Sequence, residues 1–201
     1  MPYRTDLIMG APGTGKGTQV ENILRVYDDK YLVLASGEML RAVVREGGPL
    51  ARIVNENNAR GTLTDDETMC RIFRDQLHRR AIGERILLLD GIPRTVEQAT
   101  MLEEDIDVRN IYQLVHKSDE LLIERAVGRA KEMIAQGKTP RVDDNPKTMR
   151  QRLIVYRDLT LPVIDYYRSL PNAPLIHEID AERSKDDVWT QLYAAIRVRR
   201  V

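Results

Sequence analysis

The sequence predicts an α/β fold of three layers, in which a five-stranded parallel sheet has helices on both faces. Five short apolar segments alternate with segments of helical periodicity, and RILLLD at 85–90 contains a continuous apolar run. Such runs are typical of strands that are buried on both faces of a parallel sheet. Alternation of strands and helices implies right-handed crossovers, which place helices on both sides of the sheet.

The expected strands are all short. They cover residues 6–9, 31–35, 85–90, 110–116 and 174–180. Apolar residues between 39 and 44 recur with the spacing of one helix face. GGP at 47–49 ends that helix and begins another, because proline suits a first helical turn, and Gly61 ends the second. A long helix is expected from about 145 to 167 with a bend at Pro162, and residues 197–200 are expected to form the last turn of a final helix.

Composition limits the classes of protein that the chain suits. It has 201 residues, of which 42% are hydrophobic, so one domain with a sizeable core is expected. Its 31 basic residues balance 31 acidic residues, which argues against nucleic acid or an acidic membrane surface as a partner. No stretch approaches the roughly 20 apolar residues of a membrane span.

The residue types that hold metals or form disulfides are sparse. The single cysteine, Cys70, excludes an internal disulfide, suits a reducing cytosol and is expected to fill space in a helix. The histidines, His78, His116 and His177, lack the spacing of metal ligands and are expected to be structural or exposed to solvent. Neither residue type therefore predicts a metal centre.

The stretch GAPGTGKGT at 10–18 predicts a phosphate-binding loop. It lies between an expected strand and an expected helix, and it matches G-x-x-x-x-G-K. The glycines permit left-handed backbone and close approach of N–H groups to phosphate, while the helix directs its positive end at the same anion. Lys16 reaches the outer phosphates as a point charge. The hydroxyl that usually follows the lysine comes one residue later here, at Thr18, after Gly17.

A second stretch, LLLDGIPRTVEQ at 87–98, predicts a magnesium and phosphate site. Asp90 ends an apolar strand, where open α/β sheets place groups that contact ligands. A carboxylate at this position holds Mg²⁺ directly or through water. Gly91 permits close approach to the backbone, and Arg94 lies four residues beyond Asp90 to bind a phosphate.

Further arginines suggest additional anion contacts. ASGEMLRA at 35–42 begins a helix after the second strand and carries Arg41 on its first turns. Arg125 and Arg129 share a helix face at i,i+4, where like charges repel unless an anion or acids neutralise them. A solvated face with mixed charges, supplied by the neighbouring acids at 124 and 132, is the alternative explanation. The phosphate loop favours arginines that close on phosphate, and residues 141 and 152 extend this set.

These motifs resemble the nucleoside monophosphate kinases, and most closely the adenylate kinases with a short lid. The resemblance rests on GAPGTGKGTQ, SGEMLR, GTLTDDE, LLDGIPRTVEQ, VGR and RVDDN, which occur in the family's order along nearly the whole chain. It implies the phosphate-loop kinase fold with two mobile inserts in a single domain, 1–201. The core would comprise 1–35, 66–128 and 142–201, with a monophosphate-binding insert at 36–65 and a lid at 129–141.

The resemblance also implies the site residues. ATP would contact Gly13, Thr14, Gly15, Lys16, Gly17, Thr18, Arg125, Arg129 and Arg183. AMP would contact Ser36, Arg41, Thr62, Leu63, Thr64, Gly91, Ile92, Pro93, Arg94, Gln98, Arg141 and Arg152. Catalysis would depend on Lys16, Arg94, Arg129, Arg141 and Arg152, and Asp90 would hold Mg²⁺ through water.

The implied reaction is transfer of the terminal phosphate of ATP to AMP, which gives two ADP, by a cytoplasmic monomer. A pyrimidine (UMP/CMP) monophosphate kinase is one alternative, and Gln98 favours AMP because its amide matches the donor and acceptor edge of adenine. The other is a nucleotide-dependent binding module without turnover. The chain departs from the family pattern at several positions: Ser36, Glu38, Ile92, Pro140 and Arg183.

Overall fold

The computed structural model describes residues 1–198 and contains the expected parallel sheet. Its strands are β1 (Tyr3–Gly10), β2 (Tyr31–Ala35), β3 (Ile86–Asp90), β4 (Ile106–Val115) and β5 (Leu175–Asp180), in the order β2-β3-β1-β4-β5. Every pair of neighbouring strands is parallel. The five predicted strands are confirmed, although β1 and β4 begin earlier than the apolar pattern suggests. Both early segments carry charged residues, and a β-bulge in the β1–β4 pairing at Thr5/Asp6 accommodates them.

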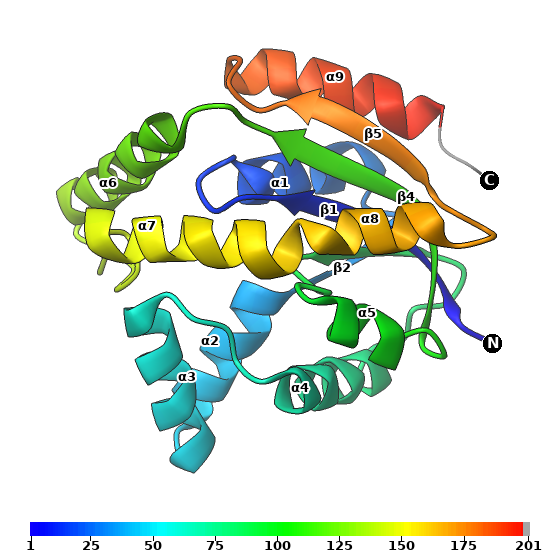
Figure 1. Cartoon of the computed structure of the whole chain (residues 1–201), viewed down its shortest axis with the longest axis horizontal. Coiled ribbons are helices and arrows are strands. Elements are labelled where there is room, and N and C mark those ends of the chain that lie inside the picture. The colour runs from blue at the N-terminus through cyan, green and yellow to red at the C-terminus, as the bar shows by residue number, and fades with distance from the viewer. Residues whose placement is uncertain (199–201) are drawn as a thin grey trace.

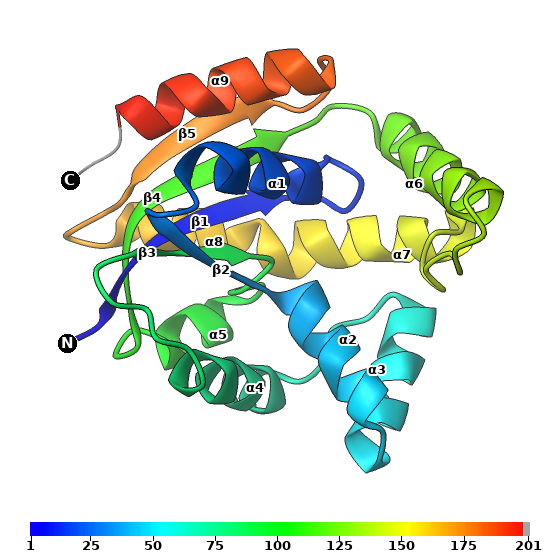
Figure 2. The same ribbon diagram turned by 180° about the vertical axis from the view of Figure 1, so that it is seen from behind.

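Helices cover both faces of this sheet, as predicted. They are α1 (Lys16–Tyr27), α2 (Ser36–Glu46), α3 (Pro49–Arg60), α4 (Asp66–His78), α5 (Val96–Met101), α6 (Asp119–Ala135), α7 (Pro146–Val155), α8 (Pro162–Ser169) and α9 (Lys185–Arg197). Helices α4, α5 and α8 pack on one face, and α1 and α9 pack on the other (Figure 1). Figure 2 shows α2 and α3 side by side and projecting away from the sheet.

Glycine and proline set several helix ends at the predicted positions. Gly47 has φ 81° and ends α2, Pro49 occupies the first turn of α3, and Gly61 has φ 73° and ends α3. The helix predicted over 145–167 is divided. A π-helical turn, η1 (Tyr156–Thr160), separates α7 from α8, and the amide of Leu161 donates to the Tyr156 carbonyl five residues earlier at 2.8 Å. This wider turn lies immediately before the proline that begins α8, where no amide hydrogen is available.

The remaining sequence expectations concern single residues. Cys70 is fully buried in α4, as expected for a residue that fills space. His177 stacks on Tyr112 with ring centroids 5.3 Å apart, which fits a structural role. Helix α9 ends at Arg197 with Val198 as its C-cap residue, and residues 199–200 of the basic segment predicted to be helical lie outside the described residues. Among helices at residues 1–198, none has the length and apolar character that crossing a membrane requires.

A buried polar network lies between the sheet and α1. The carboxylate of Asp6 accepts hydrogen bonds from Tyr31 at 2.8 Å, Asn110 at 2.7 Å and Tyr112 at 3.4 Å. All four residues are at most 1% exposed. The network joins β1 to β2 and β4, so it ties the central strand to both halves of the sheet.

The strand order places the candidate site. The chain leaves β1 toward β2 on one side, and it leaves β3 toward β4 on the other. Loops that diverge in this way open a crevice at the carboxyl ends of the strands, where open α/β sheets bind ligands. The glycine loop follows β1 and Asp90 ends β3, so both predicted phosphate motifs lie at this crevice.

Removal of the Asp6 carboxylate is predicted to destabilise the fold. Asp6→Ala leaves buried hydroxyl and amide donors without their acceptor, and each such group costs about 1–3 kcal/mol. We expect a loss of at least that size in the free energy of unfolding, measured by urea denaturation. Tyr31→Phe removes only one donor and serves as the comparison. Equal stabilities for Asp6→Ala and wild type would contradict this role for the network.

Candidate active site

The glycine loop adopts the backbone that its sequence predicts. Gly13 has φ 90° and Gly15 has φ 89°, in the left-handed region that favours glycine. A Cβ atom at Gly13 would lie 2.8 Å from the carbonyl oxygen of Leu122, so α6 also requires glycine there. The Thr14 hydroxyl is buried and donates to the Ala11 carbonyl at 2.8 Å, which closes the loop on itself. Helix α1 begins at Lys16 and directs its amino end at the crevice.

Lys16 lies at the centre of this loop. Its Nζ donates to the carbonyls of Gly10 at 2.6 Å and Ala11 at 3.1 Å. Burial, with smaller contributions from the charges of Arg94, Arg152 and Arg129, lowers the pKa of Lys16 to about 8, against the opposing effect of Asp90. The ammonium is therefore easier to deprotonate than that of an exposed lysine.

Arg94 forms a second cationic centre near Asp90. Its Nε donates to the Gly91 carbonyl at 2.8 Å, and a terminal guanidinium nitrogen donates to Ser36 Oγ at 3.0 Å. Burial, followed by the charge of Arg152, lowers the pKa of Arg94 to about 10. Gly91 has φ 72°, and a Cβ there would lie 2.6 Å from Ser36 Oγ, so glycine permits this approach between the ends of β2 and β3.

Arg129, at the start of the predicted lid, and Arg152, beyond its end, are held by acids that follow the lid. Arg129 binds Asp144 through two hydrogen bonds of 2.9 and 2.5 Å, and the Asp144 side chain is fully buried. Arg152 pairs with Asp143. Neither acid was among the predicted site residues, although the DD pair immediately after RV in RVDDN was a visible signal. Two carboxylates within a cation-rich site allow the arginines to be packed together before any phosphate enters.

The other predicted arginines differ in where their side chains lie. Arg125 donates to the carbonyls of Ala181 at 2.6 Å and Glu182 at 3.4 Å, so it joins α6 to the loop after β5. Arg141 is exposed, and desolvation together with the charges of Arg129 and Arg41 lowers its pKa. Two arginines form ion pairs with acids three residues away in this conformation: Arg41 pairs with Glu38 at 3.2 Å, and exposed Arg183 pairs with Asp180 at 3.1 Å.

The predicted acceptor residues surround a narrow cavity of about 30 Å³. Seven of its lining residues were predicted: Ser36, Thr62, Leu63, Thr64, Gly91, Arg94 and Gln98. Leu40, Asn58 and Met69 also line the cavity but were not predicted, because they occur in helical or apolar segments that are typical of a core. Pro93 is buried, and Ile92 is 2% exposed and packs in the main core, so its side chain supports the site from behind.

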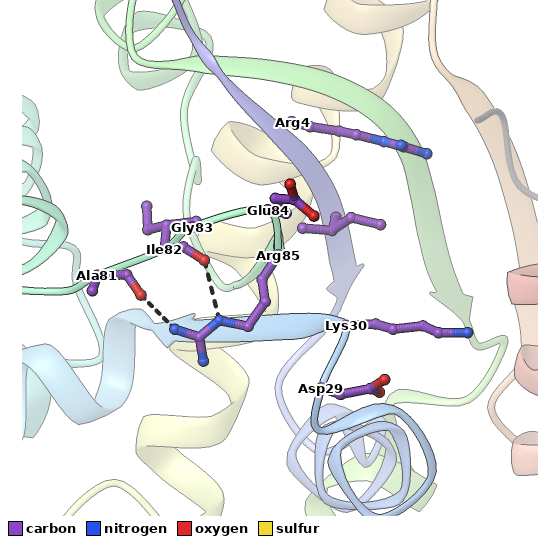
Figure 3. A pocket seen from close by; sticks show the side chains of 9 residues that line it. Arg4, Asp29, Lys30, Ala81, Ile82, Gly83, Glu84 and Arg85 are labelled. Carbon is purple, nitrogen blue, oxygen red and sulfur yellow. Dashed lines mark hydrogen bonds between the residues drawn. The ribbon is translucent and has the colours of Figure 1, made fainter.

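A larger cavity of about 640 Å³ lies at the opposite edge of the sheet. Figure 3 shows its lining: Arg4, Asp29, Lys30, Ala81, Ile82, Gly83, Glu84, Arg85 and Ile86, which gather where β1, β2 and β3 begin. Arg85 donates to the carbonyls of Ala81 and Ile82. This open cavity is lined by both acidic and basic residues and contains neither the glycine loop nor the amino end of α1. The volume of a cavity therefore does not by itself identify the phosphate site.

The residues around Asp90 fit a magnesium ion bound with a polyphosphate. Within residues 1–198, no hydrogen bond or ion pair engages the half-buried Asp90 carboxylate. Those residues also contain no group of three or more His, Cys, Asp or Glu side chains that would hold a metal alone. Mg²⁺ is usually held by one or two carboxylates, substrate phosphates and water, which is the donor set available here.

Comparison with known proteins identifies the family. The adenylate kinase family model matches residues 8–171, which include both phosphate motifs and the arginines at 129, 141 and 152. The chain belongs to the adenylate kinase family. It is 33% identical to an adenylate kinase of Nitrobacter winogradskyi, an alignment that covers 95% of this chain and 92% of the relative. It is 33% identical to adenylate kinase isoenzyme 1 of Sus scrofa, over 92% of this chain and 90% of that protein. An adenylate kinase of Xanthomonas euvesicatoria pv. vesicatoria is 35% identical over 94% and 97% of the two chains.

Phosphate binding is predicted to take up a proton at Lys16. Below pH 8 the ammonium is already charged, whereas above its pKa of about 8 it is largely neutral. A bound polyphosphate favours the charged form, so affinity falls as the pH rises through about 8. Calorimetry with tripolyphosphate at pH 8.5, in two buffers of different ionisation enthalpy, measures this uptake. The Lys16→Met variant provides the control, because its proton uptake on binding is expected to be smaller. Equal proton uptake by the variant and the wild type would assign the proton to another group.

Glycine is predicted to be required at position 91 both by the positive φ of the backbone and by the close approach of site residues. Gly91→Ala introduces strain at φ 72° and also displaces Ser36 or Arg94. Gly83→Ala is the matched control, because Gly83 has φ 60° but open space beside it. We expect both variants to lose about 1 kcal/mol or more of stability, and only Gly91→Ala to lose affinity for a nucleoside monophosphate, roughly tenfold or more. Unchanged affinity in Gly91→Ala, measured by calorimetry, would separate this glycine from the site.

Proposed function

We propose that the chain transfers the terminal phosphate of ATP reversibly to AMP and so forms two ADP. Membership of the adenylate kinase family supports this reaction. The observation that carries it is the pair of cationic centres, Lys16 and Arg94, on both of which the charge of Asp90 acts. Lys16 in its glycine loop offers one phosphate site, and Arg94 with Ser36 offers the other.

The chemistry requires positioning and charge and needs no protein nucleophile. Phosphoryl transfer is accelerated when donor and acceptor are held in line and cations stabilise the charge on the group in transit. In this proposal Gly13–Thr18 hold the ATP phosphates, Arg94 holds the acceptor phosphate, and Arg129, Arg141 and Arg152 close on the transferred group. Arg125 and Arg183 lie on the donor side, beside the loop after β5.

The burial of these cations assists the reaction directly. Lys16 and Arg94 are partly buried and are held by carbonyl or hydroxyl oxygens, so little reorganisation accompanies transfer. Mg²⁺, held by Asp90 through water, would neutralise phosphate charge and orient the oxygens of ATP. Magnesium as the cofactor and ATP, AMP and ADP as the substrates are part of the proposal.

Two segments are proposed to move: the insert at 36–65 and the lid at 129–141. The insert consists mainly of α2 and α3, which contact each other and project from the sheet (Figure 1). The Thr148 hydroxyl of α7 donates to the Ala59 carbonyl of α3 at 3.2 Å, so the end of the insert meets the helix that carries Arg152. Closure of both segments would exclude water, which competes with AMP as phosphate acceptor.

AMP is proposed as the acceptor in preference to UMP or CMP. Gln98 is 1% exposed and lines the acceptor cavity, where its amide offers a donor and an acceptor to a base. A cytoplasmic monomer is proposed as well. The single buried cysteine supports a reducing compartment, and sedimentation analysis would test the oligomeric state.

The assignment predicts how one lysine affects turnover. Lys16→Met removes an ammonium whose charge matters most during transfer, and we expect turnover to fall about 10²–10³-fold with the fold retained. A coupled assay with ATP, magnesium and AMP, CMP or UMP measures turnover, and circular dichroism measures the fold. Near-normal turnover in a folded Lys16→Met variant would remove the loop from catalysis. Equal wild-type rates with CMP and AMP would replace the adenylate assignment by the pyrimidine alternative.

A further inference from the structure

A closed set of hydrogen bonds surrounds the side chain of Gln98. Its Nε2 donates to Asp66 Oδ1 at 2.8 Å, and its Oε1 accepts from the backbone amide of Arg94 at 2.7 Å. The Thr95 hydroxyl accepts from the Gln98 backbone amide at 3.0 Å and donates to the same Asp66 oxygen at 2.9 Å. Asp66 is the first residue of α4, and the family-based set of site residues did not include it.

These partners allow one orientation of the Gln98 amide. A carboxylate only accepts hydrogen bonds, and a backbone N–H only donates them. Rotation of the amide by 180° would place Oε1 against the Asp66 carboxylate and Nε2 against the Arg94 N–H. Both contacts would then be between like groups inside a site where Gln98 is 1% exposed. The orientation of the amide therefore follows from the chemistry of its two neighbours.

The fixed orientation of the Gln98 amide determines which hydrogen-bonding groups are presented to a base in the cavity. A carboxamide has two N–H donors and two acceptor lone pairs, and the two neighbours use one of each. One donor at Nε2 and one acceptor at Oε1 remain, in a fixed spatial order. The edge of a 6-aminopurine offers a donor at its amino group and an acceptor at N1. A 6-oxopurine of the same shape offers the reverse pair.

We propose that Asp66 is a positioning residue that selects 6-aminopurine over 6-oxopurine monophosphates by fixing the orientation of the Gln98 amide. This inference rests on the proposed function, because it concerns the acceptor of the same reaction. It makes Asp66 a determinant of specificity that acts through Gln98 and leaves the phosphate contacts of Lys16 and Arg94 unaltered. AMP and inosine monophosphate differ at this edge and match in shape, so they form the test pair.

The test compares kcat/KM for AMP with kcat/KM for inosine monophosphate. In Asp66→Ala we expect the ratio to fall about tenfold to a hundredfold, the range that corresponds to loss of a hydrogen bond to a charged group. The KM for AMP should rise while kcat for AMP stays within a fewfold of wild type. Asp66→Asn keeps the shape of the side chain and can face either end of the Gln98 amide, so a smaller fall is expected. This second variant serves as the test if Asp66→Ala does not fold.

Asp65→Ala is the matched control. Asp65 is the neighbouring N-cap residue of α4, and its side chain accepts from the Thr68 amide at 2.9 Å without contacting Gln98. Its loss weakens the same helix end by about 1 kcal/mol, and we expect the AMP to inosine monophosphate ratio to stay at the wild-type value. A similar fall in both variants would assign the effect to helix stability and overturn the proposal.

Two further outcomes separate this inference from the proposed function. An unchanged ratio in folded Asp66→Ala, with wild type active on AMP, would overturn the role of Asp66 alone. Absence of AMP phosphorylation by the wild type would overturn the proposed function itself. Calorimetric affinities for AMP and inosine monophosphate without ATP provide a readout that does not depend on turnover, and they should show the same loss of discrimination.

Discussion

The concentration of positive charge at the carboxyl edge of the sheet is the constraint on which the rest of the site depends. Lys16 and Arg94 are held within the protein, on loops that follow the adjacent strands β1 and β3. Burial lowers the pKa of both side chains, and the charge of nearby Arg152 lowers both further. Such an arrangement is unfavourable in isolation, and it becomes favourable when phosphate oxygens enter.

The surrounding structure is organised to tolerate this repulsion. Carbonyl oxygens of the glycine loop accept from Lys16, and the Gly91 carbonyl accepts from Arg94. Asp143 and Asp144 hold Arg152 and Arg129, so the lid side of the site carries its own counter-charges. Gly91 serves the same end, because it brings Ser36 and the guanidinium of Arg94 closer to the backbone than a Cβ atom would allow.

The residues proposed to bind phosphate and those proposed to bind the base come from different elements. The proposed phosphate contacts lie at the ends of β1 and β3, whereas Gln98 lies on α5 and is hydrogen-bonded to Asp66 of α4. The two helices pack together on the same face of the sheet and belong to its main core. In the proposed mechanism, Gln98 is held by the core while the insert moves, so base discrimination would not depend on the mobile segment.

Local patterns in the sequence determined the class of fold, the five strands and the phosphate loop. These features depend on neighbours along the chain: apolar runs, glycine spacing and the proline that begins α3. The same patterns, with the family resemblance, identified most of the residues that line the acceptor cavity. They also suggested a continuous helix over 145–167, because helical periodicity does not distinguish a π turn from an α turn.

Tertiary structure decided which side chains meet. Asp66 and Gln98 lie 32 positions apart, and Arg129 and Asp144 lie 15 apart, so no local pattern reveals either contact. Arg41 was predicted from an anion-binding motif and Arg183 from its position in the family pattern, yet each pairs with an acid three residues away on the surface. The physical reason is that residue type and spacing specify backbone conformation, whereas hydrogen-bond partners depend on how separate elements pack. The sequence alone therefore determined the phosphate chemistry, and the packing of α4 against α5 decided how the amide of Gln98 is oriented.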